Sequence, residues 1–470
     1  MTSQNHYTKT LANYAAKVSF NDFPKEVVEK SKQHFMDSIG CALGGYRTNI
    51  GQIITNFVKY LGGNPQSTIF GSGYRTACTY AAFANAMFSN VLDYDDTIVV
   101  GTAGHPGSTI IPSAMAVAEV TNSSGKDLIT AIIAGYDVAI RVGKAIYPLP
   151  ESGRKLFGMA TYQTLGAVAT AGKLLQLTEE EMISALGIAG ADAPIPSVLK
   201  TVLGPLGPSM VKNNFGRTAE VGVAGALLAK RGFRGPLDIL DGDTGFWRAY
   251  EGNGPGKCDW DAMIRNLGKD YAIMEVGFKP YPVCRGLHSP IDATLEMTKG
   301  YDIDPKDIEE IVVRCVPPFS EDKPPFNKRE PTSMLDVQFS APYTIALAIY
   351  GIEPGPSWYS EGNLSNPEIR KLAKMVILVP YGESSKKMFS QPTYRVSTVE
   401  IKTGEKRYVR QIKFPRGEPE NPLKPQELEN KFRVNASGVI KKENIEEMIK
   451  IIRNLETIEN VREMAALLRS

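Results

Sequence analysis

The spacing of apolar residues changes near residue 268, and this change constrains the fold more than any other feature of the sequence. Between residues 50 and 61, apolar side chains fall at i, i+3, i+4, i+7, i+8 and i+11, the spacing of one face of an α-helix. Residues 25–43 and 126–147 show similar spacing. The first part of the chain, to about residue 268, therefore predicts a large all-helical domain.

Three predicted helical segments, at 164–175, 185–193 and 220–232, are rich in Ala and Gly. Small side chains let helix backbones approach closely, which suits interior helices of a large bundle. A core that is merely rich in small residues would give the same pattern.

After residue 268 the pattern becomes mixed. Residues 308–316, 375–380, 395–403 and 407–414 are rich in β-branched residues and partly alternate, which predicts strands. Helical candidates lie between them at 287–299, 335–350 and 366–374. A Pro-rich segment at 415–425 should interrupt regular structure, and helical spacing returns after it.

We therefore expect a mainly α protein. Residues 1–268 and 418–470 would form the all-helical domain, and residues 269–417 a smaller α+β domain inserted near its C-terminal end. A cleft between the two domains is the default place for a small ligand.

Composition excludes several classes of function. Lys and Arg total 53 and Asp and Glu total 51, so the net charge of +2 gives no footprint for nucleic acid or an anionic membrane. No apolar run is long enough to predict a membrane-spanning helix, and the N-terminus does not resemble a signal peptide. The five cysteines are odd in number and widely spaced, which argues against disulfides or a metal cluster and favours a cytoplasmic location. Motifs for dinucleotides, ATP or serine-hydrolase chemistry are absent from the sequence.

The first candidate site combines Val-Leu-Asp-Tyr-Asp-Asp-Thr (91–97) with Gly-His-Pro-Gly (104–107). His105 lies in a predicted loop, and a His oriented by an Asp such as Asp93 can act as a general acid or base near neutral pH. A solvated Asp-rich turn is the plain alternative. A metal site built from Asp93, Asp95, Asp96 and His105 is also conceivable, although the spacing matches no calcium loop and no zinc-protease motif.

Three further segments carry candidate groups. Lys212 precedes a predicted helix start, where an ammonium and free backbone N–H groups favour an anion. At the domain changeover, Lys279, Arg285 and His288 could bind carboxylates or move protons. Tyr343 opens a helical segment, and its hydroxyl could donate to an oxyanion. The plain alternatives are a solvated lysine, an interdomain linker and a core aromatic residue.

These segments resemble the MmgE/PrpD family when read in order. The resemblance rests on LDYDDT…GHPG, KNNFGRTAEVGVAGALLAKRGFRGP, GFKPYPVCRGLHSPIDATLEM and FSAPYTIALA, and it covers most of the chain. It implies an all-helical domain with an α+β lid domain, usually a homodimer, and catalysis without a metal or organic cofactor. The family's activities are dehydration of 2-methylcitrate, decarboxylation of cis-aconitate and epimerisation of iminodisuccinate. The resemblance assigns the site to Asp93, Thr97, His105, Lys212, Lys279 and Tyr343, with His288 also at a motif position.

One segment departs from the family pattern. Dehydratases and decarboxylases of the family resemble G-F-H-P-T-x-T-L-G, where the His belongs to the active site, but this chain has Ala160 at the His and Tyr162 at the Thr. Alanine cannot transfer a proton or donate a hydrogen bond. Either Tyr162 or another residue replaces the His, or the reaction differs. We expect a cofactor-free lyase acting on a small polycarboxylate, with an epimerase and a non-catalytic carboxylate-binding protein as the alternatives.

Overall fold

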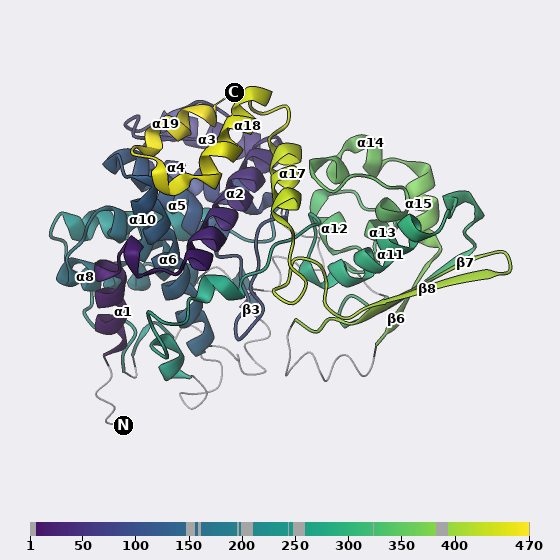
Figure 1. Ribbon diagram of the computed structural model, residues 1–470, viewed down its shortest axis with the longest axis horizontal. Helices are drawn as coiled ribbons and strands as arrows, with labels where there is room; N and C mark the ends of the chain where they lie inside the picture. The colour runs from purple at the N-terminus through teal and green to yellow at the C-terminus, as the bar shows by residue number, and fades with distance from the viewer. Residues whose placement is uncertain are drawn as a thin grey trace.

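A computed structural model describes residues 6–146, 156–157, 161–194, 197–198, 210–242, 244–247, 259–322, 324–381 and 393–469. Figure 1 shows two parts side by side, a larger helical part and a smaller part that contains the main sheet. The chain passes from the first to the second part once and returns at its C-terminal end. This architecture confirms the predicted mainly α fold.

The helical part is formed by segments from both ends of the chain. Its helices are α1 (Tyr7–Lys17), α2 (Lys25–Tyr46), α3 (Asn49–Leu61), α4 (Cys78–Val91), α5 (Gly107–Thr121), α6 (Gly125–Ile146), α7 (Gln163–Leu174), α8 (Glu179–Ala191), α10 (Phe215–Lys230), α17 (Pro425–Ala436), α18 (Lys442–Arg453) and α19 (Val461–Leu467). Two small antiparallel pairs accompany them, β1 (Ser67–Thr68) with β2 (Arg75–Thr76), and β3 (Leu156–Phe157) with β4 (Ser197–Val198). Short 3₁₀ turns are η1 (Phe20–Asp22), η5 (Trp260–Met263), η6 (Ala272–Glu275) and η10 (Leu455–Thr457).

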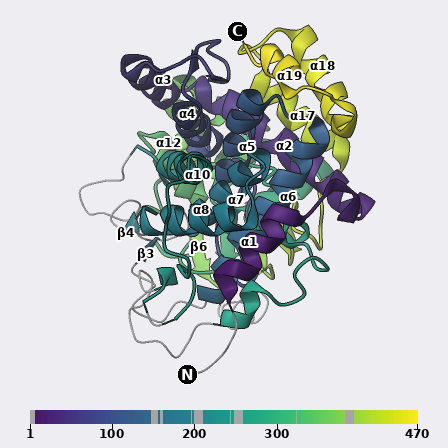
Figure 2. The ribbon, with the colours of Figure 1, turned by 90° about the vertical axis from the view of Figure 1, so that its left-hand side faces the viewer.

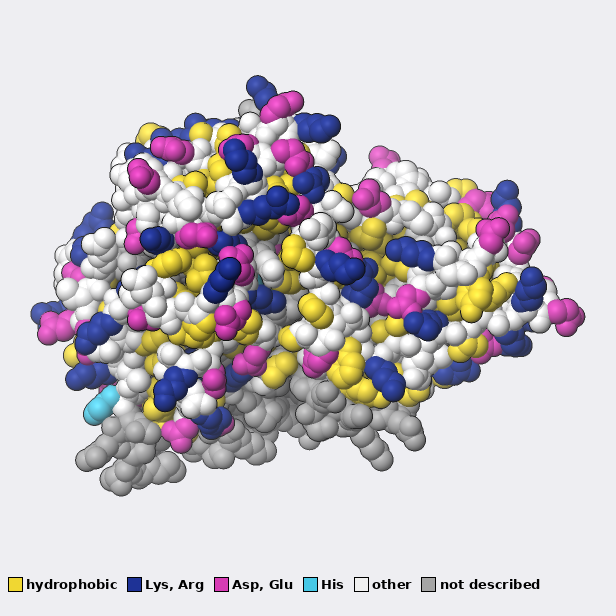
Figure 3. Space-filling view, in the orientation of Figure 1, with side chains coloured by type: hydrophobic (Ala, Val, Ile, Leu, Met, Phe, Trp, Pro, Cys, Tyr) yellow, Lys and Arg dark blue, Asp and Glu magenta, His cyan; other side chains and the backbone are white. Residues whose placement is uncertain are grey.

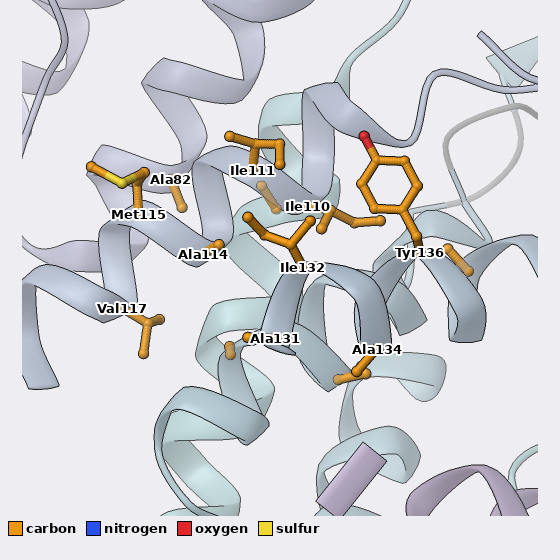
Figure 4. Close-up of a cluster of buried hydrophobic side chains, with 14 of the residues drawn as sticks. Ala82, Ile110, Ile111, Ala114, Met115, Val117, Ala131, Ile132, Ala134 and Tyr136 are labelled. Atoms are coloured by element: carbon orange, nitrogen blue, oxygen red, sulfur yellow. The ribbon is translucent and has the colours of Figure 1, made fainter. Parts of the chain in front are cut away.

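Small residues do bring interior helices close together. A Cβ added to Gly222 of α10 would lie 2.5 Å from Ala167 Cβ of α7, and one added to Gly166 of α7 would lie 2.6 Å from Ala139 Cβ of α6. Figure 4 shows the aliphatic cluster between α5 and α6, with Tyr136 at one end of it. The Ala- and Gly-rich segments therefore set the spacing of these helices.

The apolar face of α3 is only partly used by the core. Ile54 and Val58 are buried, whereas Ile53 and Phe57 remain 49% and 42% exposed, and Tyr60 is 86% exposed. Figure 2 shows α3 at the outer edge of the helical part. The helical spacing predicts the helix correctly, but one side of its apolar face lies at the surface.

The α+β part contains a four-stranded sheet in the order β6-β5-β7-β8. Its strands are β5 (Glu310–Cys315), β6 (Val376–Pro380), β7 (Ser397–Thr403) and β8 (Lys406–Ile412), and β5 pairs in parallel with β6 and antiparallel with β7. Its helices are α11 (His288–Gly300), α12 (Met334–Phe339), α13 (Ala341–Ile349), α14 (Glu361–Leu364) and α15 (Pro367–Lys374), with turns η7 (Arg285–Leu287), η8 (Pro305–Asp307) and η9 (Pro356–Tyr359). All four predicted strands are present.

The helix predicted at 335–350 is two helices. Ser340 takes an extended conformation between α12 and α13, and its hydroxyl accepts a hydrogen bond from the Tyr343 N–H. Pro342 lies two residues later, and it cannot continue a preceding helix because it lacks an N–H and its ring clashes with the previous turn. The chain therefore turns at Ser340 and starts a new helix.

The described residues form two large hydrophobic cores and two small clusters. The first extends to Val276 and resumes at Phe432, and the second runs from Tyr281 to Ile412. No helix of the described residues is long and apolar enough to cross a membrane. On the face shown in Figure 3, positive and negative side chains are interspersed.

Candidate active site

The turn after α4 and the loop before α5 place Asp93 and His105 beside each other. Asp93 has φ 49°, in the left-handed region that Asp tolerates better than most residues, and its N–H donates to the Asn90 carbonyl at 2.8 Å. The glycines around His105 allow close packing, since a Cβ on Gly104 would lie 2.1 Å from the Tyr162 hydroxyl and one on Gly107 2.8 Å from Asp96 Oδ2. The Gly-His-Pro-Gly motif thus brings this loop against its neighbours.

His105 is buried and its tautomer is defined by its neighbours. Nδ1 lies 2.8 Å from the Asp96 carbonyl, which can only accept, so Nδ1 carries the proton. Nε2 lies 3.4 Å from the ammonium of Lys212, which can only donate, so Nε2 presents its lone pair. Burial, with the nearby Lys279 and Lys212 and against the pull of Asp95, lowers the pKa of His105 to about 4. The ring is therefore a neutral base at neutral pH.

Two buried lysines meet at Asp93. Lys212 Nζ lies 3.0 Å from both carboxylate oxygens of Asp93, and Lys279 Nζ contacts Oδ1 and the Asp93 carbonyl. Burial alone would raise the pKa of Asp93, but Lys212 and Lys279 hold it at about 2. Burial would lower the pKa of Lys212, but Asp93 raises it. Asp93 and Lys212 therefore stay charged, and the two lysine side chains meet next to the imidazole.

The role predicted for Asp93 changes in the structure. Its nearest carboxylate oxygen is 4.0 Å from His105 Nε2, while Asp95 Oδ2 is 3.5 Å from Nδ1 and the Asp96 backbone accepts the Nδ1 proton. Consecutive loop residues point in different directions, so neighbouring carboxylates serve different partners. Asp93 pairs the lysines, and Asp95 and Asp96 orient His105.

A buried polar network supports this loop. Asp95 accepts from the Ser108 hydroxyl at 2.5 Å and from Asn90 Nδ2 at 3.0 Å, and burial raises its pKa. Asn90 Oδ1 in turn accepts a hydrogen bond at 3.2 Å from Nδ2 of Asn213, the residue that follows Lys212 in the sequence. The Asp-rich loop and the segment before α10 are thereby joined.

Asp96 is fixed from the opposite side. It accepts from the Gly107 N–H at 2.9 Å and from the Tyr136 hydroxyl at 2.6 Å. His34 Nδ1 lies 2.9 Å from Asp96 Oδ2 but is not in line for a hydrogen bond. Burial raises the pKa of Asp96 to about 6 and lowers that of His34. His34 and Tyr136 carry no motif signal and were not predicted from the sequence.

Thr97 and Tyr162 lie against these loops. The Thr97 N–H donates to the Gly277 carbonyl, and the Gly277 N–H donates back, each at 2.9 Å, which sets the path of the chain to Lys279. The buried Tyr162 donates its hydroxyl to the Ala103 carbonyl at 2.8 Å. Ala160, the position of the family departure, lies outside the described residues.

Arg285 and His288 form a separate buried group. Arg285 Nε donates to Glu418 at 2.6 Å, and an Nη donates to His288 Nδ1 at 3.1 Å. Burial and the charge of Arg285 lower the pKa of His288. This arrangement joins Arg285, where the chain enters the α+β part, to Glu418, where the chain leaves it. The second terminal nitrogen of Arg285 has no hydrogen-bond partner among the described residues, so binding of a ligand carboxylate by Arg285 stays a prediction.

The structure does not bring Tyr343 to the His105 cluster. Its ring is buried in the core of the α+β part and its hydroxyl donates to the Asn363 carbonyl at 2.5 Å. Burial raises its pKa to about 12. The expected oxyanion donor is thus a core aromatic residue, the plain alternative for this position.

A different tyrosine of the α+β part approaches the site. The Tyr359 hydroxyl lies 2.9 Å from the Leu92 carbonyl and also contacts the Pro282 carbonyl, and Gln338 Nε2 donates to the Val91 carbonyl at 2.9 Å. Both side chains hold the chain just before Asp93. Neither lies in a motif whose spacing reveals this role, so sequence reasoning missed them.

Asp93, Asp95 and His105 could also hold a metal ion, since one ligand atom from each lies within 4.8 Å of the others. However, Lys212 and Lys279 already contact the carboxylate of Asp93 with ammonium groups. A cation there would have to displace two buried positive charges. The donor set therefore fits an anion-binding site better than a metal centre.

Comparison with known proteins agrees with these motifs. The chain matches the MmgE/PrpD N-terminal domain over residues 9–258 and the MmgE/PrpD C-terminal domain over residues 281–457. It is 28% identical to the cis-aconitate decarboxylase of Homo sapiens, over 98% of this chain and 94% of that protein. The cis-aconitate decarboxylases of Mus musculus and Aspergillus terreus are 28% and 26% identical, over 98% of this chain and 93% and 95% of their own lengths. The sequence resemblance is confirmed, and the chain belongs to the MmgE/PrpD family.

Proposed function

We propose that this protein is a cofactor-free lyase that removes water or carbon dioxide from a small di- or tricarboxylic acid. The observation that carries the proposal is that the buried imidazole of His105 lies beside Lys212 and Lys279, which both contact Asp93. The relatives named as cis-aconitate decarboxylases act on an acid of this class.

In the proposed mechanism, Lys212 and Lys279 bind substrate carboxylates and stabilise negative charge that develops on the neighbouring carbon. In dehydration, the lone pair on Nε2 of His105 takes the proton from that carbon, the C–O bond to the neighbouring hydroxyl breaks, and the leaving hydroxide takes this proton from the imidazolium and departs as water. In decarboxylation, the C–C bond to a carboxylate breaks, carbon dioxide leaves, and the carbanion takes a proton that Nε2 relays from water. The Asp96 carbonyl holds the Nδ1 proton and keeps the ring in this tautomer. Carbon acids next to a carboxylate are weak, so preorganised positive charge must supply most of the stabilisation.

The test is incubation of the purified protein with cis-aconitate, 2-methylcitrate and related acids in D₂O. A lyase gives a dehydrated or decarboxylated product, followed by NMR. His105→Gln should lower turnover by at least about 10²-fold, the usual contribution of one positioned acid–base group. His6→Gln, an exposed histidine in the same domain, is the matched control and should leave turnover unchanged. Unchanged turnover in His105→Gln would remove His105 from the mechanism.

An epimerase or other isomerase is the second candidate. Alanine at position 160 favours it, because epimerisation needs proton exchange but no group to assist departure of a hydroxyl. Deuterium uptake into the unchanged acid, without a dehydrated or decarboxylated product, would support this reaction. A thermal shift with the same acids, without deuterium uptake or consumption, would instead indicate a carboxylate-binding protein without catalysis.

We also propose that the protein forms a homodimer, as is usual in the family, through the exposed apolar face of α3. Ile53, Phe57 and Tyr60 lie on one side of this helix at i, i+4 and i+7, and contiguous exposed apolar surface commonly marks an interface. Light scattering should give twice the mass of one chain for the wild type and one chain for Phe57→Glu. Val409→Glu, at an exposed position of β8, is the control. A dimer that survives Phe57→Glu excludes this face. The cytoplasmic location stays a prediction.

A further inference from the structure

Lys431 is a third buried lysine near the site, and it comes from the C-terminal segment. It lies on the inner face of α17, between the buried Leu428 and Phe432. In Figure 1, α17 lies at the junction of the two parts, beside α2. Gly40 of α2 permits this approach, since a Cβ there would lie 3.1 Å from Phe432 Cδ2. The packing places the ammonium of Lys431 behind the Asp93 loop.

The contacts of this ammonium with the described residues are all to segments that position the site. Lys431 Nζ donates to Asp37 Oδ1 of α2 at 2.6 Å, to the Tyr94 carbonyl at 2.5 Å and to the Lys279 carbonyl at 3.0 Å. It also lies 4.0 Å from the ring centre of Tyr94. Tyr94 directly follows Asp93, so one ammonium joins the backbones of both partners of the Asp93–Lys279 ion pair.

The charge of Lys431 is itself held in place. Burial would lower its pKa, but Asp37 raises it. Asp37 is buried, and its second carboxylate oxygen has no hydrogen-bond partner in the part of the chain that the structure describes, so this carboxylate depends on Lys431. Through this pair, Lys431 donates hydrogen bonds to the Tyr94 and Lys279 carbonyls, which are buried near Asp93.

We propose that Lys431 is a positioning residue, which sets the relative position of Asp93 and Lys279 through the Tyr94 and Lys279 carbonyls. It has no contact with the reacting groups in this role. Displacement of a catalytic group by about 1 Å typically costs about 10²-fold in rate, so loss of the donor should reduce turnover by that order. The activity part of this inference rests on the proposed function.

The chain offers a control at a second contact between α2 and the C-terminal segment, made with η10 and α18 instead of α17. Lys32 of α2 is buried to the same extent as Lys431, with 5% of each side chain exposed. Lys32 Nζ pairs with Glu456 at 2.6 Å and donates to the Arg453 carbonyl at 3.0 Å. It therefore ties α2 to the C-terminal segment in the same way, but it holds no backbone next to the site.

The experiment compares Asp37→Asn/Lys431→Met with Lys32→Met/Glu456→Gln. Each double variant removes the lysine together with its shortest carboxylate contact. Lys32 also pairs with Glu29 at 2.9 Å, but Glu29 is exposed and stays solvated, so neither variant leaves a buried charge unpaired. We expect similar melting temperatures for the two variants. The Lys431 variant should lose about 10²-fold in kcat, with a smaller change in KM, and the Lys32 variant should keep wild-type kcat. A similar kcat in both variants would overturn the proposal.

Crystal structures of the two variants provide a test that needs no substrate. In the Lys431 variant the contact between Lys279 Nζ and Asp93 should lengthen, and in the Lys32 variant it should persist. Retention of that contact in the Lys431 variant would overturn the positioning role, whatever the activity. If the wild type consumes none of the candidate acids, the proposed function fails, and the structures alone decide the role of Lys431.

Discussion

The substitution Lys212→Met gives the sharpest test of the site, because it changes the pKa of His105 in a direction that is easily misjudged. Methionine keeps the approximate length of the side chain and removes its charge. The wild-type pKa is about 4, since burial and two lysines act against protonation. Lys212 lies 3.4 Å from Nε2, whereas Asp93 lies 4.0 Å away with the opposite charge.

The magnitude follows from these two distances. At an effective dielectric constant of about 20, a unit charge at 3.4 Å contributes about 5 kcal/mol and one at 4.0 Å about 4 kcal/mol. In the wild type the two contributions nearly cancel for an imidazolium at His105. Removal of Lys212 leaves the attraction of Asp93 unbalanced. One pKa unit corresponds to about 1.4 kcal/mol, so the upper limit is a rise of between about three and four units. Water entering the vacated space will screen the charge, and we expect a rise of about one to two units.

Histidine-labelled protein makes this measurable by NMR, because the chain has only four histidines. The ring signals would be followed from about pH 4 to about pH 8, with His105→Gln used for assignment. Lys371→Met, an exposed lysine of α15, removes the same charge from the other domain and should leave the His105 signal unchanged. A wild-type pKa near 6.5, or a folded Lys212→Met protein whose His105 pKa stays put or falls, would refute this account of the site.

Three further outcomes follow from the same contacts. Arg285→Met leaves the buried Glu418 without its ion-pair partner and should lower the free energy of unfolding by about 3–5 kcal/mol in urea titrations, whereas a loss under about 1 kcal/mol would contradict the buried pair. Gly104→Ala brings a Cβ to 2.1 Å from the Tyr162 hydroxyl and should reduce turnover; adding Tyr162→Phe should restore part of it, and no recovery would show that this contact is not the cause. In the unfolded chain His105 takes up a proton near pH 6.5, but in the folded protein only near pH 4. The free energy of unfolding should therefore fall by up to about 3 kcal/mol as the pH drops from 6.5 to 4. Urea titrations of His105→Gln should show a weaker pH dependence than those of the wild type.

Much of the fold could be predicted because local spacing reports which side of an element is apolar. The four strands and the helices at 25–43 and 126–147 follow from that spacing, within a few residues at each end. Spacing does not tell what covers the apolar side, so the exposed half of α3 could not be foreseen. The break at Ser340 was readable from Pro342, but the continuous apolar pattern on both sides concealed it.

The site was only partly predictable for a related reason. Asp93, His105, Lys212 and Lys279 come from unusual local sequences, and the fold does bring them together. The loop geometry decides which of Asp93, Asp95 and Asp96 pairs with the lysines and which orient His105. Sequence periodicity does not predict the conformation of a loop. Tyr343 shows the converse, since a tyrosine in a motif can equally satisfy its hydroxyl within a core.

The charges at Asp93 suggest why such a site must be buried and tightly held. Without a ligand, Asp93 neutralises part of the charge of Lys212 and Lys279, so neither ammonium is left unpaired in a medium of low dielectric constant. In the proposed mechanism, a polycarboxylate that enters must compete with Asp93 for the same two donors. Only an acid whose carboxylates reach both lysines can replace the two ion pairs that Asp93 makes. Selection of such an acid then depends on the distance between the two lysines. Lys431 holds the Lys279 backbone against the Asp93 loop, so it can affect the reaction although it does not contact the reacting groups.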